Sequence, residues 1–116
     1  MTNDIQIIVA DSFEHEAKKL IKCYRSLKNE LAELIENMKV NPFQGVDLGG
    51  GVRKIRLAIS SKGKGKSGGA RVISHTEIVL EMMSGTVTLL YIYDKSEQST
   101  ISDKQIQKLL KEAGLK

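Results

Sequence analysis

The chain has 116 residues, of which 41% are hydrophobic and 28% charged, and its formal net charge is +4 at pH 7. This length predicts one domain over residues 1–116, with a single hydrophobic core. No apolar run approaches the roughly 18 residues of a membrane-spanning helix, and the first residues lack the pattern of a secretory signal, so we expect a cytoplasmic protein without a membrane partner.

The first third of the sequence predicts a strand followed by two helices. Apolar residues alternate over 5–9, which is typical of a strand, and Asp11 with Glu14 three positions later forms the pattern of a capping box. Apolar residues then recur at i, i+4, i+7, i+8 and i+11 in two successive segments, which predicts two helices with one buried face each. These residues are Phe13, Ala17, Leu20, Ile21 and Tyr24, then Leu27, Leu31, Leu34, Ile35 and Met38.

The single cysteine, Cys23, excludes an internal disulfide, and we interpret it as a core thiol of the first helix. Pro42 ends the second helix.

The rest of the sequence predicts strands and a last helix. Three segments have the apolar alternation of strands: 52–59, a strand from about Ala70, and 86–93. Residues 45–51 are rich in glycine and favour a flexible lead into the first of them, while 77–83 can extend the second or form a loop. Ser102 with Gln105 predicts a capped helix that ends at Gly114. The order β-α-α-β-β-β-α predicts an α+β domain, with two N-terminal helices and one C-terminal helix against a small antiparallel sheet.

Positive charge is concentrated in the middle of the chain. Residues 51–75 carry seven Lys or Arg side chains and no Asp or Glu, whereas residues 1–50 sum to −2 and residues 76–116 to −1. The seven cations are Arg53, Lys54, Arg56, Lys62, Lys64, Lys66 and Arg71. Like charges repel one another, so such a cluster favours a polyanionic partner, most commonly a phosphate backbone. A solvated basic loop is the alternative interpretation.

Strand alternation predicts which of these side chains share a face of the sheet. The expected groups are Lys54 with Arg56, Arg71 with His75, and Tyr91 with Tyr93 and Lys95. If the three faces coincide, one side of the sheet carries cations, an imidazole and two phenols, which could bind a phosphate and move protons. A structural histidine and ordinary packing of the tyrosines are the alternatives.

The glycines of the basic loop match a nucleotide-binding pattern only by letter. Gly63, Gly65 and Gly68 spell G-x-G-x-x-G, but the dinucleotide-binding motif opens a helix and this loop leads into a predicted strand. We interpret the glycines as allowing close approach to a phosphate backbone by Lys62, Lys64 and Lys66. With one cysteine and two histidines, neither a metal site nor a cofactor is expected.

These features resemble the RelE/ParE superfamily of bacterial toxins from toxin–antitoxin systems, and most closely its HigB-like members in the RelE branch. The resemblance is carried by segments 52–56, 62–73 and 89–97. It implies a compact antiparallel sheet with two N-terminal helices and a cognate antitoxin as protein partner. It also implies cleavage of messenger RNA in the ribosome, without a metal ion, in the bacterial cytoplasm.

The resemblance also assigns individual residues. It places the family's basic pair on Lys54 and Arg56, the phosphate-binding arginine on Arg71, and a basic residue after the last strand near Lys95. The arginine typical of RelE itself would align with Ser96. The later tyrosine of RelE has no counterpart, since residues 97–116 contain none.

Our first hypothesis is therefore an endoribonuclease, an mRNA interferase, that uses the 2′-hydroxyl of the RNA as nucleophile. Arg71 would bind the scissile phosphate and Arg56 would stabilise the transition state, because arginine does not lose its proton in proteins and cannot be the base. Lys54, His75 and Lys95 are the candidates for base and acid, and RNA binding is assigned to Arg53, Lys62, Lys64 and Lys66. A ParE-like inhibitor of DNA gyrase and a non-catalytic RNA-binding module are the alternative functions.

Overall fold

The structure is a computed structural model that describes all residues except 1–3, 64, 66, 83 and 116. Its helices are α1 (Asp11–Cys23), α2 (Leu27–Val40) and α3 (Asp103–Glu112). Its strands are β1 (Asp4–Val9), β2 (Val46–Gly49), β3 (Val52–Leu57), β4 (Ala70–Val79) and β5 (Ser84–Asp94), with short 3-10 turns at Ser60–Lys62 and Leu80–Met82. The predicted α+β class and the predicted positions of the three helices are confirmed.

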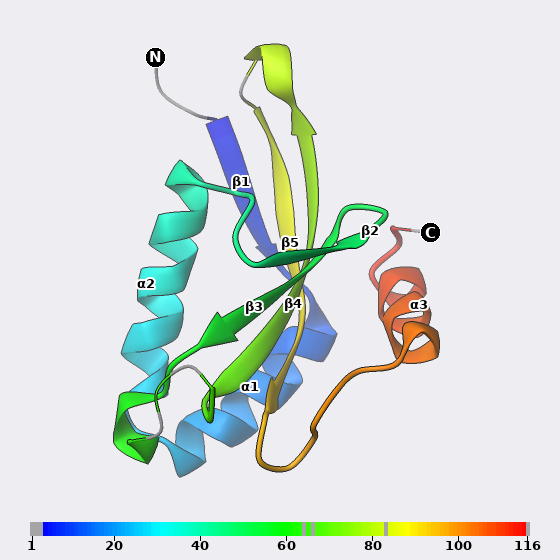
Figure 1. Ribbon diagram of the computed structural model, residues 1–116. Coiled ribbons are helices and arrows are strands. Elements are labelled where there is room, and N and C mark those ends of the chain that lie inside the picture. The colour runs from blue at the N-terminus through cyan, green and yellow to red at the C-terminus, as the bar shows by residue number, and fades with distance from the viewer. Residues whose placement is uncertain (1–3, 64, 66, 83, 116) are drawn as a thin grey trace.

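The five strands form one mixed sheet in the order β1-β5-β4-β3-β2 (Figure 1). The strands from β2 to β5 pair antiparallel, but β1 pairs parallel with β5, so that Ile5 lies opposite Gly85. The predicted fully antiparallel sheet is therefore wrong at this edge. Parallel pairing requires a long crossover, and the intervening chain supplies one.

A strand also exists where a flexible lead was expected. β2 pairs with β3 through a turn in which Gly49, Gly50 and Gly51 have φ angles of 94°, 61° and 86°. Residues with side chains rarely adopt such angles, so the glycines permit a tight hairpin turn here. The strand has only four residues, Val46–Gly49, which is too short for a clear alternation, and this is why it was missed.

The two faces of the sheet carry separate hydrophobic clusters. On the helix-pair face, α1 and α2 pack against apolar residues of the sheet such as Ile55, Val72 and Leu89. On the opposite face, which we call the α3 face, α3 packs on Ile73 and Leu90. Figure 1 shows α3 separated from the other two helices by the sheet. No helix in the described part of the chain is long and apolar enough to cross a membrane.

The helix ends agree only partly with the sequence patterns. At α3 the prediction is confirmed, since Ser102 Oγ accepts a hydrogen bond from the Gln105 backbone N–H at 3.1 Å. At α1 the expected capping box is absent: the N-cap is Ala10, and Asp11 is already the first helical residue. Cys23, expected in the core, is exposed at the last residue of α1.

Candidate active site

Two arginines and a tyrosine lie in one row across three strands of the α3 face. Arg56 of β3 lies directly opposite Arg71 of β4, and Arg71 lies directly opposite Tyr93 of β5. Residues paired across strands point to the same side of a sheet, so the three side chains are neighbours. We call Arg56, Arg71 and Tyr93 the arginine row.

Lys54 occupies the next row of the same face. It lies opposite Ile73, which in turn lies opposite Tyr91. A bulge between Ile73 and Ser74 adds one residue to β5 and puts both Leu90 and Tyr91 on the α3 face. The structure thus brings together Lys54, Arg56 and Arg71, with the first half-buried and the second exposed.

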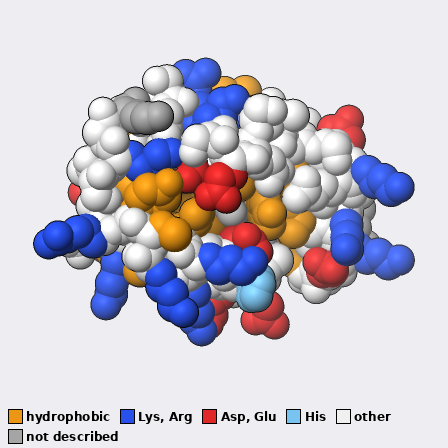
Figure 2. All heavy atoms as spheres, turned by 90° about the horizontal axis from the view of Figure 1, so that it is seen from below, with side chains coloured by type: hydrophobic (Ala, Val, Ile, Leu, Met, Phe, Trp, Pro, Cys, Tyr) orange, Lys and Arg blue, Asp and Glu red, His pale blue; other side chains and the backbone are white. Residues whose placement is uncertain are grey.

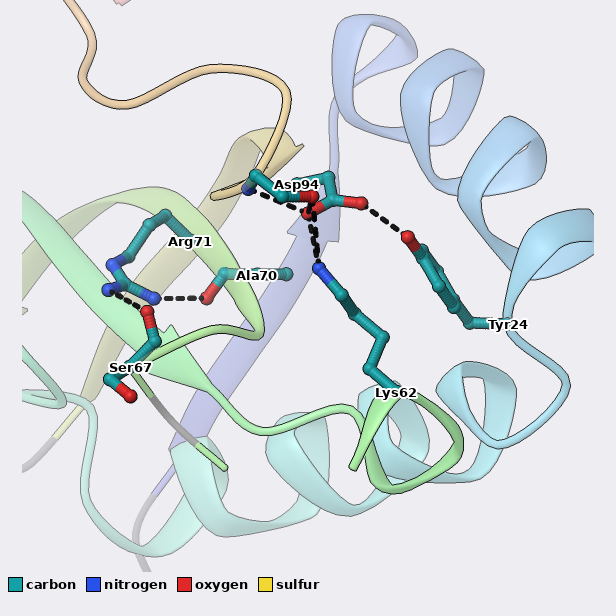
Figure 3. Close-up of polar contacts among 7 residues, drawn as sticks. Tyr24, Lys62, Ser67, Ala70, Arg71 and Asp94 are labelled. Atoms are coloured by element: carbon teal, nitrogen blue, oxygen red, sulfur yellow. Dashed lines mark hydrogen bonds and ion pairs between the residues drawn. The ribbon is translucent and has the colours of Figure 1, made fainter. Parts of the chain in front are cut away.

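Arg71 is buried rather than accessible, with 6% of its surface exposed. Its guanidinium donates hydrogen bonds of 3.2 Å from Nη1 to the Ala70 carbonyl and from Nη2 to the Ser67 carbonyl (Figure 3). From the sequence we expected Arg71 to bind the scissile phosphate. The structure shows a guanidinium held in place by the chain that enters β4.

The loop before β4 can pack closely against the end of β3 because Gly69 has no side chain. A Cβ atom at Gly69 would clash with the backbone carbonyl of Leu57, the last residue of β3. The glycine before β4 therefore permits close packing of the loop on the neighbouring strand.

Tyr93 is buried beside Arg71, with 4% of its surface exposed. Its hydroxyl has no hydrogen-bond partner among the described residues. Burial raises the pKa of Tyr93, while the nearby positive charge of Arg71 acts in the opposite direction. Its ring centroid lies 6.2 Å from that of Tyr91.

His75 shares the α3 face but lies apart from the arginine row. It pairs with Val52 and Thr88, four positions along β4 from Arg71. It lines a pocket of about 790 Å³ together with His15, and neither arginine borders that pocket. Proximity therefore gives no support to a role for His75 at Arg71.

Lys95 follows β5 and turns toward the chain that leads to α3. Its Nζ donates a hydrogen bond to the Ser99 carbonyl at 2.7 Å, and its backbone N–H donates to the Gly69 carbonyl at 3.1 Å. One of the three N–H donors of its ammonium is therefore bound to a backbone acceptor of its own segment.

Lys62, expected to contact RNA, lies in a buried ion pair with Asp94. Lys62 Nζ is 2.6 Å from Asp94 Oδ1, and the two side chains are 7% and 1% exposed. The Asp94 carboxylate also accepts hydrogen bonds of 2.6 Å from the Tyr24 hydroxyl and 2.7 Å from the Ser96 hydroxyl. In Figure 3 this carboxylate lies between the side chains of Lys62 and Tyr24. In this arrangement the Lys62 ammonium is not open to a phosphate backbone.

The ionisation of this cluster follows from its contacts. Burial alone would raise the pKa of Asp94, but hydrogen bonds from Lys62, Tyr24 and Ser96 outweigh it and hold that pKa well below its ordinary range. The hydrogen bond to Asp94, together with burial, raises the pKa of Tyr24 to about 12. Asp94 and Tyr24 were missed by the sequence analysis. The signal that could have pointed to Asp94 is an acidic residue at the end of a strand beside a strongly basic loop.

The turn at Ser60–Lys62, which opens the basic loop, is also attached to α2. The Glu30 carboxylate accepts hydrogen bonds from the Ser60 backbone N–H at 2.7 Å and from the Ser60 hydroxyl at 2.6 Å. Burial acts to raise the pKa of Glu30, and the hydrogen bonds from Ser60 and Ser26 lower it overall. The start of the loop is therefore held by two acidic residues.

Arg53 points to the face opposite Lys54 and Arg56. It donates hydrogen bonds of 2.9 Å to the Gln44 and Gly45 carbonyls, and its guanidinium lies 5.8 Å from the centroid of the Phe43 ring. These contacts attach it to the segment before β2. Lys64 and Lys66 lie outside the described residues.

The described cations of residues 51–75 therefore do not form one continuous positive surface. They divide between the α3 face, the helix-pair side and a buried ion pair. Figure 2 shows one side of the molecule on which Lys and Arg side chains are spread among hydrophobic and acidic ones. Among the described residues, no group of three or more His, Cys, Asp or Glu side chains could hold a metal ion.

Residues 6–115 match the family described as the RelE toxin of the RelE/RelB toxin–antitoxin system. The match spans nearly the whole chain and includes the three strands of the arginine row together with Lys54. The chain belongs to the RelE toxin family, and it is a toxin of a toxin–antitoxin system.

Proposed function

We propose that this toxin is a ribosome-dependent, metal-independent endoribonuclease that cleaves messenger RNA. The observation that carries the proposal is the register of Arg56 and Arg71, which lie directly opposite each other on adjacent strands. Like charges in this position are destabilising, and Arg71 is in addition largely withdrawn from water. A phosphate bound at the row would offset both costs.

The proposed reaction uses groups of the RNA and of the row. A base takes the proton of the 2′-hydroxyl, the 2′-oxygen attacks the adjacent phosphorus, and the bond to the 5′-oxygen breaks. The products are a 2′,3′-cyclic phosphate and a 5′-hydroxyl. Arg71 binds two oxygens of the scissile phosphate through its planar guanidinium, and Arg56 stabilises the charge that builds up on the phosphorane.

Lys54 is the base that the geometry favours. It lies one row from Arg71 on the same face, and in its neutral form it can accept the 2′-hydroxyl proton. His75 is about 13 Å along the strand from Arg71 at the usual rise per residue. Lys95 donates its ammonium hydrogen bond to Ser99.

The partners follow from this activity. A cytoplasmic ribonuclease of this kind requires a cognate antitoxin that silences it, and the family match implies such a partner. We further propose HigB-like members as its nearest relatives, and the ribosome with its bound message as its substrate. Exposed Arg56 provides one phosphate contact, and Lys64 and Lys66 remain proposed contacts from the loop.

The test is cleavage of a message by the purified protein on ribosomes, with the cut positions mapped from the new 5′ ends. We expect cuts only in the presence of ribosomes, and an unchanged rate after addition of EDTA. Lys39→Ala serves as a control for the loss of a positive charge away from the row, and it should cleave at the wild-type rate. Lys39 is an exposed lysine on α2 that pairs with Glu36. Loss of cleavage with EDTA would reject the metal-independent mechanism. Intact messages together with inhibited gyrase would favour the ParE-like alternative.

A further inference from the structure

Tyr93 is the member of the arginine row to which no role has been assigned. Its hydroxyl and that of Ser74 are the two buried side-chain polar atoms without a hydrogen-bond partner in the described part of the chain. A buried hydroxyl is nearly always hydrogen-bonded in folded proteins, because leaving it unpaired costs free energy. The phenol of Tyr93 therefore needs an explanation.

Packing alone does not explain the hydroxyl. The ring belongs to the hydrophobic cluster of the α3 face, where it packs among residues such as Ile73, Ile101 and Ile106. Phenylalanine would fill the same space without an unpaired polar atom. The hydroxyl is thus a cost to the folded protein unless a partner from outside the chain satisfies it.

The position of Tyr93 indicates what that partner is. Tyr93 lies directly opposite Arg71, which lies directly opposite Arg56. An anion held by Arg71 would be the nearest external acceptor for the phenolic O–H. A tyrosine phenol carries its proton near neutral pH, so its O–H can donate a hydrogen bond to such an anion.

We propose that Tyr93 is a catalytic residue of this toxin, which donates a hydrogen bond to the scissile phosphate beside Arg71 and protonates the departing 5′-oxygen. This inference rests on the proposed ribonuclease function. When the phosphate binds, its oxygens replace the Ser67 and Ala70 carbonyls as acceptors for the Arg71 guanidinium. The same phosphate then supplies the acceptor that the Tyr93 hydroxyl lacks.

The proton balance of the step is complete. Lys54 in its neutral form gains the proton of the 2′-hydroxyl as the 2′-oxygen bonds to phosphorus. The bond between phosphorus and the 5′-oxygen breaks, and that oxygen takes the phenolic proton of Tyr93. Water returns a proton to the phenolate and removes one from Lys54, so the enzyme is regenerated without any redox change.

The test is Tyr93→Phe, assayed on ribosomes with two matched messages. One message carries the normal 5′-oxygen at the cut site, and the other carries sulfur in its place. A thiolate leaves without protonation because thiols are far more acidic than alcohols. We expect the variant to cleave the normal message about 10²-fold more slowly than wild type or worse. We expect it to cleave the sulfur-substituted message at close to the wild-type rate.

A control variant isolates the hydroxyl of Tyr93. Ser74→Ala removes the other unpaired buried hydroxyl of the described residues and should cleave at close to the wild-type rate. The melting temperature of Tyr93→Phe should equal or exceed that of wild type, because no protein hydrogen bond is lost. A lower melting temperature would overturn the inference, since the hydroxyl would then have a structural partner.

The remaining outcomes separate this inference from the proposed function. If wild type cleaves and Tyr93→Phe cleaves the normal message equally fast, the role of Tyr93 is rejected while the ribonuclease stands. If Tyr93→Phe is equally slow on both messages, Tyr93 is not the acid. If wild type itself leaves both messages intact, the proposed function fails.

Discussion

Two adjacent residue pairs between β4 and β5 differ in how their charged side chains are partnered. The first pair, Ala70 with Asp94, faces α1 and α2, and there the Asp94 carboxylate has a lysine and two hydroxyls as partners. The second pair, Arg71 with Tyr93, faces α3, where a second arginine lies opposite Arg71 and the phenol has no hydrogen-bond partner among the described residues.

This difference separates charged residues that stabilise the fold from charged residues that are candidates for binding a ligand. An ion pair that is satisfied within the chain, such as Lys62 with Asp94, attaches the basic loop to the sheet. Arg56 and Arg71, in contrast, place like charges opposite each other, which is the observation behind the proposed phosphate site. A count of charges along the sequence treats Lys62 and Arg71 alike, whereas the structure pairs Lys62 with Asp94 and places Arg71 opposite another arginine.

The largest expected effect is on stability, at Asp94. Asp94→Asn leaves the Lys62 ammonium buried without its counter-ion, and breaking a buried pair in this way typically costs about 3–5 kcal/mol. Urea denaturation should show this loss. Glu97→Gln, an exposed neighbour, should change the free energy of unfolding by less than about 0.5 kcal/mol. A small effect of Asp94→Asn would contradict a structural role for the pair.

The second effect is on catalysis, at Arg71. Arg71→Lys keeps the charge but loses the planar pair of donors, so cleavage should fall by about 10² to 10³-fold, or roughly 2.7–4 kcal/mol of transition-state stabilisation. The assay is ribosome-dependent cleavage, with circular dichroism to confirm folding. Because Arg71 is buried, the lysine variant is a cleaner test than alanine. Cleavage at the wild-type rate would remove Arg71 from the site.

The third effect concerns Tyr24 and pH. Tyr24→Phe removes a hydrogen bond to a charged group, which should cost about 1.5–3 kcal/mol of stability. The pKa of Tyr24 is raised to about 12, so its contribution is complete below pH 10 and is lost as the pH rises toward 12. Wild type should therefore lose stability over this range more steeply than Tyr24→Phe. Equal slopes would contradict the hydrogen bond.

The same cluster predicts the response to acid. The pKa of Asp94 is lowered in the folded state, so its contribution is present above the ordinary value of about 4 and is lost as the pH falls below it. Thermal unfolding measured from pH 6 down to pH 2 should show this loss in wild type. In Asp94→Asn the loss should be smaller.

The smallest effect has the opposite sign and lies at Arg56. Arg56→Gln removes a like charge facing Arg71, so it should stabilise the free protein by about 0.2–1 kcal/mol. The same change should slow cleavage. A variant that is both more stable and less active is the outcome that a functional, incomplete row requires. Loss of stability would show that Arg56 is balanced within the chain.

Periodicity was sufficient to predict most elements of this fold from sequence. The apolar spacing in residues 13–38 located both N-terminal helices, and the alternation at Lys54 and Arg56 placed them on one face. The hairpin strand β2 was missed because it is only four residues long and runs directly into a glycine turn. Cys23 was misplaced because the helix ends at that residue.

The site was less predictable, because its decisive contacts join distant parts of the chain. Lys62 and Asp94 are 32 residues apart, and Tyr24 lies 70 residues before Asp94. No local sequence pattern indicates that Lys62 forms an ion pair with Asp94. The pairing of Arg56 with Arg71 depends on the register between β3 and β4. The alternation of apolar and polar residues predicts which face each side chain is on, but it does not predict which residues lie opposite each other.

The parallel pairing of β1 with β5 has a consequence for the order of folding. β1 is synthesised before the other four strands, yet its partner in the sheet lies about 80 residues later in the chain. Contacts between such distant segments close a long loop and form slowly. The strand that carries Tyr93 is likewise among the last to be made. The arginine row therefore cannot be complete until β5 has been synthesised and has paired with β4, however early the strands that carry Arg56 and Arg71 are made.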